Sequence, residues 1–194
     1  KVDYKFYPIV NLKDWVKNTQ QKAAVIHEAL DEFECDLVWL DADAVILKKL
    51  ELFDKLANDN DFHLYIHRAY HLPLKIDNDG LLSFIRRNIS NFLKRRKHPK
   101  GEVISNSIYI KNCAKTKELV SKWVALNEHK IEWDQRNLQE IIDAGDSDYV
   151  VKQLPKEYAR ILPKGNQLET LNDGNNYIGQ KQASRSYRKT IHNF

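Results

Sequence analysis

Two carboxylates, Asp41 and Asp43, stand two positions apart at the end of a nearly continuous apolar run, 37–40. In strand geometry residues i and i+2 project to the same side, so these two side chains are expected to lie close together. Such a pair is stable when a cation stands between the two groups, because like charges repel and burial favours the neutral acids. Mg²⁺ and Mn²⁺ are commonly held by one or two carboxylates together with the phosphates of a substrate. The spacing therefore predicts a divalent metal and a phosphate-bearing ligand, and the simpler interpretation is a pair of solvated carboxylates.

The residues around this pair predict alternating helices and strands. The run 36–46 is typical of a strand buried on both faces, and a helix with Thr19 as its N-cap precedes it. Further helices are expected over 50–57, 116–126 and 134–144, and further strands over 62–67, 102–111 and 149–154. This alternation favours an α/β fold in which helices flank a mainly parallel sheet. Ligands bind such sheets at the carboxyl ends of the strands, which is where Asp41 and Asp43 fall.

Length and composition fit a single globular domain over 1–194. The 194 residues are 42% hydrophobic and 30% charged, which excludes a disordered or collagen-like chain. No apolar run approaches the roughly 18 residues of a membrane span. The 31 lysines and arginines exceed the 27 acids and give a formal charge of +4, which permits an anionic partner without requiring one. Cys35 and Cys113 are too few for a disulfide scaffold and lack metal-ligand spacing, so a cytoplasmic location is predicted.

An insertion-like segment at about 80–101 repeats apolar residues at steps of three and four, which predicts an amphipathic helix. Residues 86–100 contain seven lysines and arginines and no acid. A charge run is usually a solvated face, but beside an apolar stripe it also fits peripheral contact with an anionic membrane. Nucleic-acid binding is not expected, because no recognised module accompanies the charges.

The C-terminal segment 163–194 differs in composition from the rest of the chain. It is polar and contains Gly165, Gly174 and Gly179. We expect it to be rich in loops and to lie over the domain.

The acidic pair lies within a motif that resembles the DxD strand of GT-A glycosyltransferases. The matching residues are Val38-Trp-Leu-Asp41-Ala-Asp43-Ala-Val-Ile46. In that family the strand follows a helix with a lysine, here Lys22, and precedes a short helix similar to Leu50-Glu-Leu-Phe53.

Three later segments are also similar to motifs of this family and follow in family order. Asn106-Ser-Ile-Tyr-Ile-Lys-Asn112 resembles a second family strand, with Ile108 in place of the usual glycine. Trp133-Asp134-Gln135 resembles a helix start found near the donor sugar, and Thr190-Ile-His192-Asn193 resembles a late histidine motif. The resemblance extends over nearly the whole chain, from about Lys22 to His192.

The resemblance implies a GT-A-like (Rossmann-like) fold and transfer of a sugar from a nucleotide-diphosphate donor. The donor would be a UDP- or GDP-sugar, and the acceptor a glycan, a lipid-linked molecule or a protein. A metal site of Asp41, Asp43 and His192 is implied, with Mn²⁺ or Mg²⁺ as the cofactor. Asp134 would bind hydroxyl groups of the donor sugar and Gln135 would lie near the anomeric carbon, which favours a retaining reaction.

Two further residues are implied to bind the donor together with Asp41. Lys22 would approach the diphosphate, and Asn106 would orient the sugar or the metal shell. Simpler structural roles also fit: a solvated helix lysine for Lys22 and a strand-end hydrogen bond for Asn106. Asp134 and His192 also have simpler interpretations: Asp134 could be a helix cap, and His192 an exposed residue of the C-terminal tail.

Two other functions remain open. The acidic motif also fits the first signature of haloacid-dehalogenase-type phosphatases, with Asp41 as the nucleophile and Asp43 as the acid, although no Ser or Thr ends the strand 62–67. A non-catalytic module that binds nucleotide sugars or glycans is the second alternative. GT-A enzymes begin with a strand and helix that hold the base, and only 1–18 is available here. That unit is therefore expected to precede Lys1, or the base is held differently.

Overall fold

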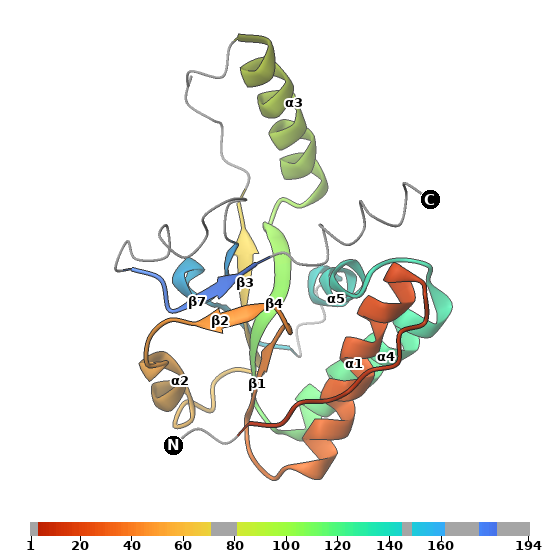
Figure 1. Cartoon of the computed structure of the whole chain (residues 1–194), viewed down its shortest axis with the longest axis vertical. Helices are drawn as coiled ribbons and strands as arrows, with labels where there is room; N and C mark the ends of the chain where they lie inside the picture. Colours follow the sequence, from red (N-terminus) through yellow and green to blue (C-terminus); the bar gives the residue numbers. More distant parts are fainter. Residues whose placement is uncertain (1–3, 71–80, 145–148, 162–174, 182–194) are drawn as a thin grey trace.

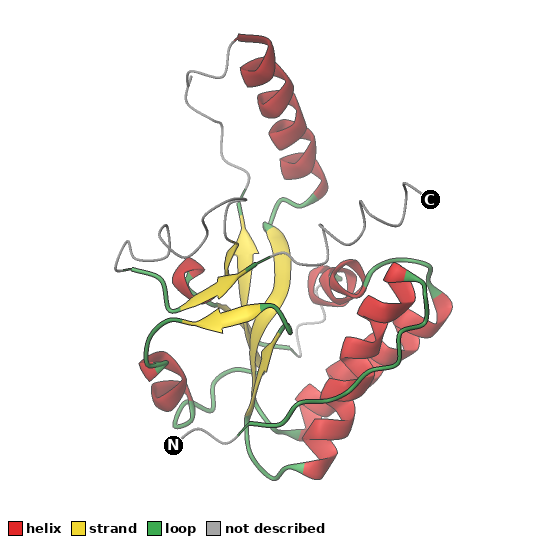
Figure 2. Ribbon diagram, in the orientation of Figure 1, coloured by secondary structure: helices red, strands yellow, loops and turns green. Residues whose placement is uncertain are grey.

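A four-stranded sheet and a three-stranded sheet organise the chain in the computed structural model, which describes residues 4–70, 81–144, 149–161 and 175–181 (Figure 1). The larger sheet has the order β1 (Leu37–Leu40), β4 (Glu102–Ile110), β3 (Leu64–Ala69) and β5 (Val151–Gln153). The smaller sheet has the order β2 (Ala44–Ile46), β7 (Ile178–Gln180) and β6 (Arg160–Ile161). The predicted α/β class is confirmed, with helices flanking the sheets (Figure 2).

The larger sheet is mixed in its pairing. Strand β4 is antiparallel to both β1 and β3, whereas β5 is parallel to β3. Strands β1, β3 and β5 therefore share one direction, but the prediction of mainly parallel pairing is wrong for the ladders that β4 makes. The apolar runs could not reveal this, because a strand covered on both faces looks alike in either kind of ladder.

Three helices cover one face of the larger sheet: α1 (Trp15–Glu32), α4 (Ala114–His129) and α5 (Asp134–Asp143). They form a hydrophobic core with β3 and β4, whose most buried side chains include Ile26, Leu30, Ile66, Ile108, Leu119, Trp123 and Leu138. Each such aliphatic side chain removed from water contributes roughly 1.5–3 kcal/mol.

Helix α1 begins at Trp15 rather than at the predicted Thr19. The N-cap is Asp14, whose Oδ1 accepts a hydrogen bond from the backbone N–H of Lys17 at 3.1 Å. The hydroxyl of Thr19 instead donates to the carbonyl of Val16 at 2.8 Å, within the helix. The helix therefore begins before Thr19, because the side chain of Asp14 already accepts the otherwise unpaired backbone N–H of Lys17.

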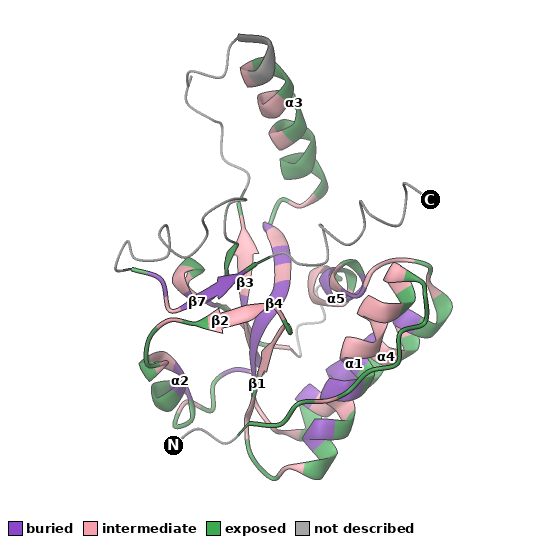
Figure 3. Ribbon diagram, viewed as in Figure 1, coloured by how far each residue is buried: buried purple, intermediate pink, exposed green. Residues whose placement is uncertain are grey.

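The other face of the larger sheet packs against α2 (Glu51–Leu56), the 3₁₀ helix η1 (Lys156–Tyr158) and the smaller sheet. This second core contains Phe53, Phe62, Tyr109, Leu154, Tyr158 and Ile178. Strand β4 supplies both cores, since Ile108 and Ile110 face the first and Tyr109 faces the second. Its buried residues are visible through the centre of the molecule in Figure 3.

The run 36–46, predicted as one strand, is divided between the two sheets. Strand β1 ends at Leu40 and β2 begins at Ala44, whose N–H donates to the carbonyl of Asp41 at 2.9 Å. Asp41–Asp43 is therefore a turn. A continuous buried strand would have to desolvate both carboxylates, and the turn removes that cost.

Strand β4 bulges at its centre, beside the carboxyl end of β1. Ile66 of β3 pairs with Ile108, but the next residue, His67, pairs with Ile104. The intervening residues 105–107 have no partner in β3. This bulge consists of three buried polar residues, Ser105, Asn106 and Ser107. Bulges of this kind redirect side chains, which suits a site.

The predicted helix of the segment 80–101 is present as α3 (Leu81–Lys97), between β3 and β4. The C-terminal segment was expected to be rich in loops, but Gly179 lies within β7. Gly165 and Gly174 lie outside the described residues. Among the residues that the structure describes, no helix has the length and apolar character needed to cross a bilayer.

Candidate functional site

Four elements converge on the ammonium group of Lys22, which lies on α1. Its Nζ is 2.9 Å from Oδ1 of Asp41, at the end of β1, and 3.1 Å from Oδ2 of Asp134, at the start of α5. It also donates to the carbonyl oxygen and the Oγ of Ser105 in the β4 bulge, at 3.1 and 3.2 Å. We call Lys22, Asp41, Ser105 and Asp134 the lysine cluster.

The lysine cluster is largely buried. The side chains of Lys22 and Asp134 are 11% and 5% exposed, and that of Asp41 is 34% exposed. Burial alone would lower the pKa of Lys22, but the nearby carboxylates of Asp134 and Asp41 outweigh it and raise the pKa above its ordinary value of 10.5. Lys22 is therefore a charged, buried residue, and its interpretation as a solvated helix lysine is wrong.

The negative charge of Asp41 is balanced by Lys22 within the protein. Its Oδ1 accepts hydrogen bonds from Lys22 and from Nε1 of Trp39, the latter at 2.9 Å, and its backbone N–H donates to the carbonyl of Asn106 at 3.0 Å. Its Oδ2 has no hydrogen-bond partner within the described part of the chain. A metal was predicted because the carboxylates of Asp41 and Asp43 should repel each other. Lys22 partly relieves that repulsion.

Asp43 lies in the turn, half-buried, and its carbonyl accepts from the backbone N–H of Lys181 at 3.2 Å. The expectation that Asp41 and Asp43 share one side of a strand does not apply, because neither residue is in a strand. Both remain next to each other at the same corner, where β1 passes into β2.

Asp134 directs its carboxylate into the lysine cluster rather than to the end of its own helix. The Oγ of Ser105 lies at hydrogen-bond distance from its Oδ2, at 3.3 Å, and Nε1 of Trp123 donates to its backbone carbonyl at 2.9 Å. The N-cap of α5 is Trp133, which makes no side-chain cap. Asp134 is therefore not the N-cap of α5, but its carboxylate does lie in the first turn, where the helix dipole favours a negative charge.

Gln135 and Gln139, one turn apart on α5, close the free edge of β4. Oε1 of Gln135 accepts the backbone N–H of Ser105 at 3.4 Å, and Oε1 of Gln139 accepts that of Val103 at 2.5 Å. Nε2 of Gln139 also donates to the carbonyl of Gly101 at 3.2 Å and to the carboxylate of Asp143. Gln139 was not among the predicted site residues, although it lies at i, i+4 from Gln135 in the sequence.

Asn106 and Gln180 each carry a buried side-chain oxygen, Oδ1 and Oε1, that has no hydrogen-bond partner among the described residues. Nδ2 of Asn106 donates to the carbonyl of Ala159 at 3.5 Å, and Nε2 of Gln180 donates to the carbonyl of Asn106 at 3.2 Å. Exchanging either amide's nitrogen and oxygen would set oxygen against oxygen, so these contacts fix both orientations. Two acceptors are thus left unsatisfied beside the turn. Gln180 was missed because a three-residue strand gives no periodic signal.

The predicted metal ligands Asp41 and Asp43 carry carboxylate oxygens, a donor type that suits Mg²⁺ or Mn²⁺. No group of three or more His, Cys, Asp or Glu side chains within the described ranges has the arrangement of a metal site. The predicted third ligand, His192, lies outside those ranges.

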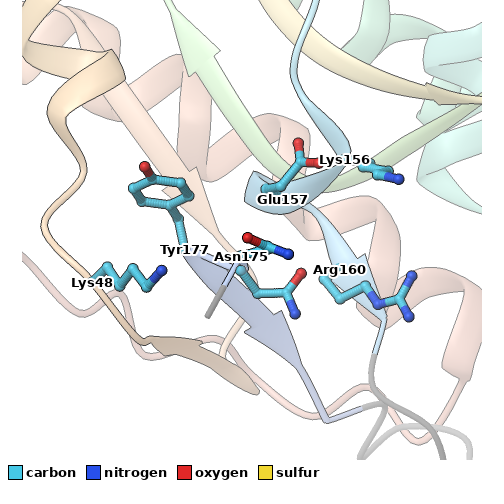
Figure 4. Close-up of a pocket in the computed structure, with 7 residues that line it drawn as sticks. Lys48, Lys156, Glu157, Arg160, Asn175 and Tyr177 are labelled. Carbon is cyan, nitrogen blue, oxygen red and sulfur yellow. The ribbon is translucent and has the colours of Figure 1, made fainter. Parts of the chain in front are cut away.

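A polar pocket of about 380 Å³ lies at the other end of β2 from the acids (Figure 4). Its lining comes from the end of β2, from η1 and β6, and from the residues before β7: Lys48, Lys156, Glu157, Arg160, Asn175, Asn176 and Tyr177. The ring of Tyr177 stacks on Tyr158 with centroids 4.6 Å apart. Three cationic side chains against one acid suit a polar or anionic ligand. No motif in the sequence indicated this pocket.

No protein-family model matches this sequence, and no curated protein matches it. Among solved structures, the chain is similar to a glycosyltransferase involved in the glycosylation of the major capsid of PBCV-1, with a TM-score of 0.59 and 11% identity. That match covers 98% of this chain and 82% of the other. The fold is GT-A-like. Mouse xyloside xylosyltransferase 1 in its apo form matches with a TM-score of 0.48 and 15% identity, over 85% of this chain and 63% of that one.

The GT-A-like fold places five of the predicted site residues around one point. Lys22 contacts both Asp41 and Asp134, Gln135 binds the bulge of β4, and Asn106 is part of that bulge, with its side chain directed at the carbonyl of Ala159. Their roles toward a ligand stay predictions.

Proposed function

We propose that this protein is a metal-dependent glycosyltransferase that transfers a sugar from a nucleotide-diphosphate donor. The observation that carries the proposal is the convergence of Lys22, Asp41 and Asp134 at the carboxyl end of β1 in a GT-A-like fold. This is the end at which open α/β sheets bind ligands. The glycosyltransferase among the structures that this chain resembles supports the same class of reaction.

The proposed metal ligands are Asp41 and Asp43, with His192 as the third. The Oδ2 of Asp41, for which the described residues provide no hydrogen-bond partner, supports this assignment. A divalent cation bound there, Mn²⁺ or Mg²⁺, would supply charge neutralisation for the departing diphosphate.

We assign Lys22 a positioning role. An ammonium group has three N–H bonds, and here they are directed at Asp41, Asp134 and Ser105. Lys22 therefore fixes both carboxylates at one separation before any ligand binds. Preorganised charge of this kind lowers the reorganisation needed during reaction.

Asp134 and Gln135 are the proposed contacts of the donor sugar, and Asn106 the proposed residue that orients it. The unsatisfied Oδ1 of Asn106 supports a role as an acceptor for a hydroxyl group or a metal-bound water. Retention of configuration is the proposed outcome, and it rests on the resemblance of the Asp134-Gln135 motif.

The proposed donor is a UDP- or GDP-sugar, and the proposed acceptor a glycan, a lipid-linked molecule or a protein. A cytoplasmic location is proposed as well. It is supported by the free thiols of Cys35 and Cys113, since reduced cysteines are the rule in the cytosol.

Hydrolysis of UDP- and GDP-sugars in Mn²⁺ tests the proposal. We expect turnover that EDTA abolishes and that falls by about 100-fold or more in Asp43→Asn, because the diphosphate loses its charge partner. The matched control is Asp54→Asn on α2, an exposed acid away from the turn, which should keep wild-type turnover.

Two other results would replace the proposal. Donor binding without turnover of any donor, with or without acceptors, would identify a binding module. Hydrolysis of small phosphomonoesters that is lost in Asp41→Asn would identify a phosphatase.

A further inference from the structure

Helix α3 turns its hydrophobic stripe to solvent. Ile85, Ile89, Phe92 and Leu93 follow helical spacing along one side, and each is between 44 and 58% exposed. Figure 1 shows α3 standing away from the sheets, and Figure 3 shows its exposed surface. Water contacts most of this apolar stripe, which is unfavourable unless another surface covers it.

The opposite arrangement would be expected of a helix that packs on its own domain. The half-buried side of α3 contains Phe84, Arg87, Asn88 and Asn91 and is mostly polar. Among the described residues, α3 does not pack extensively against any other helix or strand. No described element of this chain therefore covers the stripe, which makes it a candidate docking surface.

The charges beside the stripe identify its partner. Arg86, Lys94, Arg95, Arg96 and Lys97 are exposed on the same helix, and residues 86–100 contain no acid. An apolar stripe flanked by lysine and arginine matches the boundary between acyl chains and anionic headgroups of a bilayer. A purely anionic partner such as RNA would use the charges but would leave the stripe in water.

The position of α3 relates this surface to the lysine cluster. The helix follows the carboxyl end of β3 and precedes the start of β4. Strands β1 and β3 run in the same direction, because both are antiparallel to β4. The carboxyl ends of β1 and β3 therefore point in the direction in which α3 extends, although β1 ends earlier, with Asp41 beside the centre of β4.

We propose that α3 docks on an anionic lipid bilayer, with Ile85, Ile89, Phe92 and Leu93 at the acyl boundary and the basic side chains among the headgroups. Docking keeps the domain, and with it Asp41, near the membrane surface. Among the proposed acceptors, this favours a lipid-linked molecule, and only that last step rests on the proposed function.

Co-sedimentation of the full chain with phosphatidylcholine vesicles, with and without phosphatidylglycerol, tests the docking. We expect binding to the anionic vesicles that weakens between about 0.15 M and about 1 M salt. Arg95→Glu combined with Arg96→Glu should weaken it by about tenfold or more. Ile89→Ser combined with Leu93→Ser keeps every charge and should have a similar effect.

Lys49→Glu combined with Lys55→Glu is the matched control. It reverses the charge of two exposed side chains, one in α2 and one just before it, and α2 lies far from α3 (Figure 1). This control should bind as the wild type does, and far-UV circular dichroism confirms that each variant is folded. Unchanged binding of either α3 variant would overturn the proposal. The proposal would also be overturned if the chain bound neither kind of vesicle and instead bound RNA or self-associated through α3. These results do not depend on donor turnover, so a failure here leaves the glycosyltransferase proposal untouched.

Discussion

At the scale of single residues, Lys22 determines the electrostatics of the candidate site. It joins carboxylates that belong to different elements, Asp41 after β1 and Asp134 on α5. Removing one partner of a buried ionic group is costly, because the remaining charges lose both water and counter-charge. The lysine therefore contributes to stability and to the geometry of the site together.

Replacing Lys22 with methionine should lower the free energy of unfolding by about 3 kcal/mol at neutral pH. The loss is placed at the lower end of the range for buried pairs, because Asp41 is partly exposed. Urea unfolding measures it. Lys17→Met, on an exposed position of the same helix, should change the free energy by about 0.5 kcal/mol or less. Equal losses in both variants would show that Lys22 has no special electrostatic role.

The stabilisation from Lys22 should also depend on pH in a defined direction. The pKa of Lys22 is higher in the folded protein than its ordinary value of 10.5, so the stabilisation is complete below that pH. It is lost as the pH rises through the higher folded value. We expect the stability difference between wild type and Lys22→Met to be larger at about pH 8 than at about pH 11. A difference that grows with alkalinity would contradict the raised pKa.

At the scale of elements, the bulge of β4 is held by α5 rather than by another strand. Strand β1 ends at Leu40, so the edge of β4 near Val103 has no strand beside it on that side. Gln135 and Gln139 replace the missing ladder with side-chain hydrogen bonds. The helix that presents Asp134 is thereby fixed to the strand that presents Ser105 and Asn106.

Gln139→Ala should therefore destabilise the protein by about 2 kcal/mol, because the buried N–H of Val103 loses its acceptor. Chemical denaturation measures the change. Arg136→Ala on the same helix removes an exposed ion pair with Glu132 and a cation–π contact with Trp133, and about 1 kcal/mol or less is expected from it. If the two variants behave alike, α5 is not attached through Gln139.

The sequence predicted those elements whose patterns are long. Helix α5 begins at Asp134 as predicted, and the periodic helices and the apolar β4 lie close to their expected positions. The break at Asp41–Asp43 and the bulge at Ser105 were not predicted, because a polar residue in an apolar run does not show where backbone pairing stops. Strands β6 and β7 are two and three residues long, too short for a periodic signal. The contact between Lys22 and Asp134 depends on how α1 and α5 pack, which no local pattern contains.

At the scale of the whole molecule, the proposed ligand should stabilise the fold, since anything that binds only the folded state does so. Mn²⁺ together with UDP or GDP should raise the thermal unfolding midpoint. At a ligand concentration of about 100 times Kd the gain is about 2.7 kcal/mol. Differential scanning calorimetry measures this gain. In Asp43→Asn most of the gain should vanish, whereas Asp54→Asn should retain it. A gain that persists in Asp43→Asn would place the ligand elsewhere, for example in the pocket beside Tyr177.

The turn at Asp41–Asp43 joins two sheets that are otherwise separate ladders. The backbone of Asp41 is bound to β4 in the larger sheet, and that of Asp43 to Lys181, directly after β7 in the smaller one. A rigid-body displacement of one sheet against the other would change the separation of the two acids. A ligand that contacts both acids would oppose that displacement. Its binding should therefore affect backbone amides as distant as those of β6.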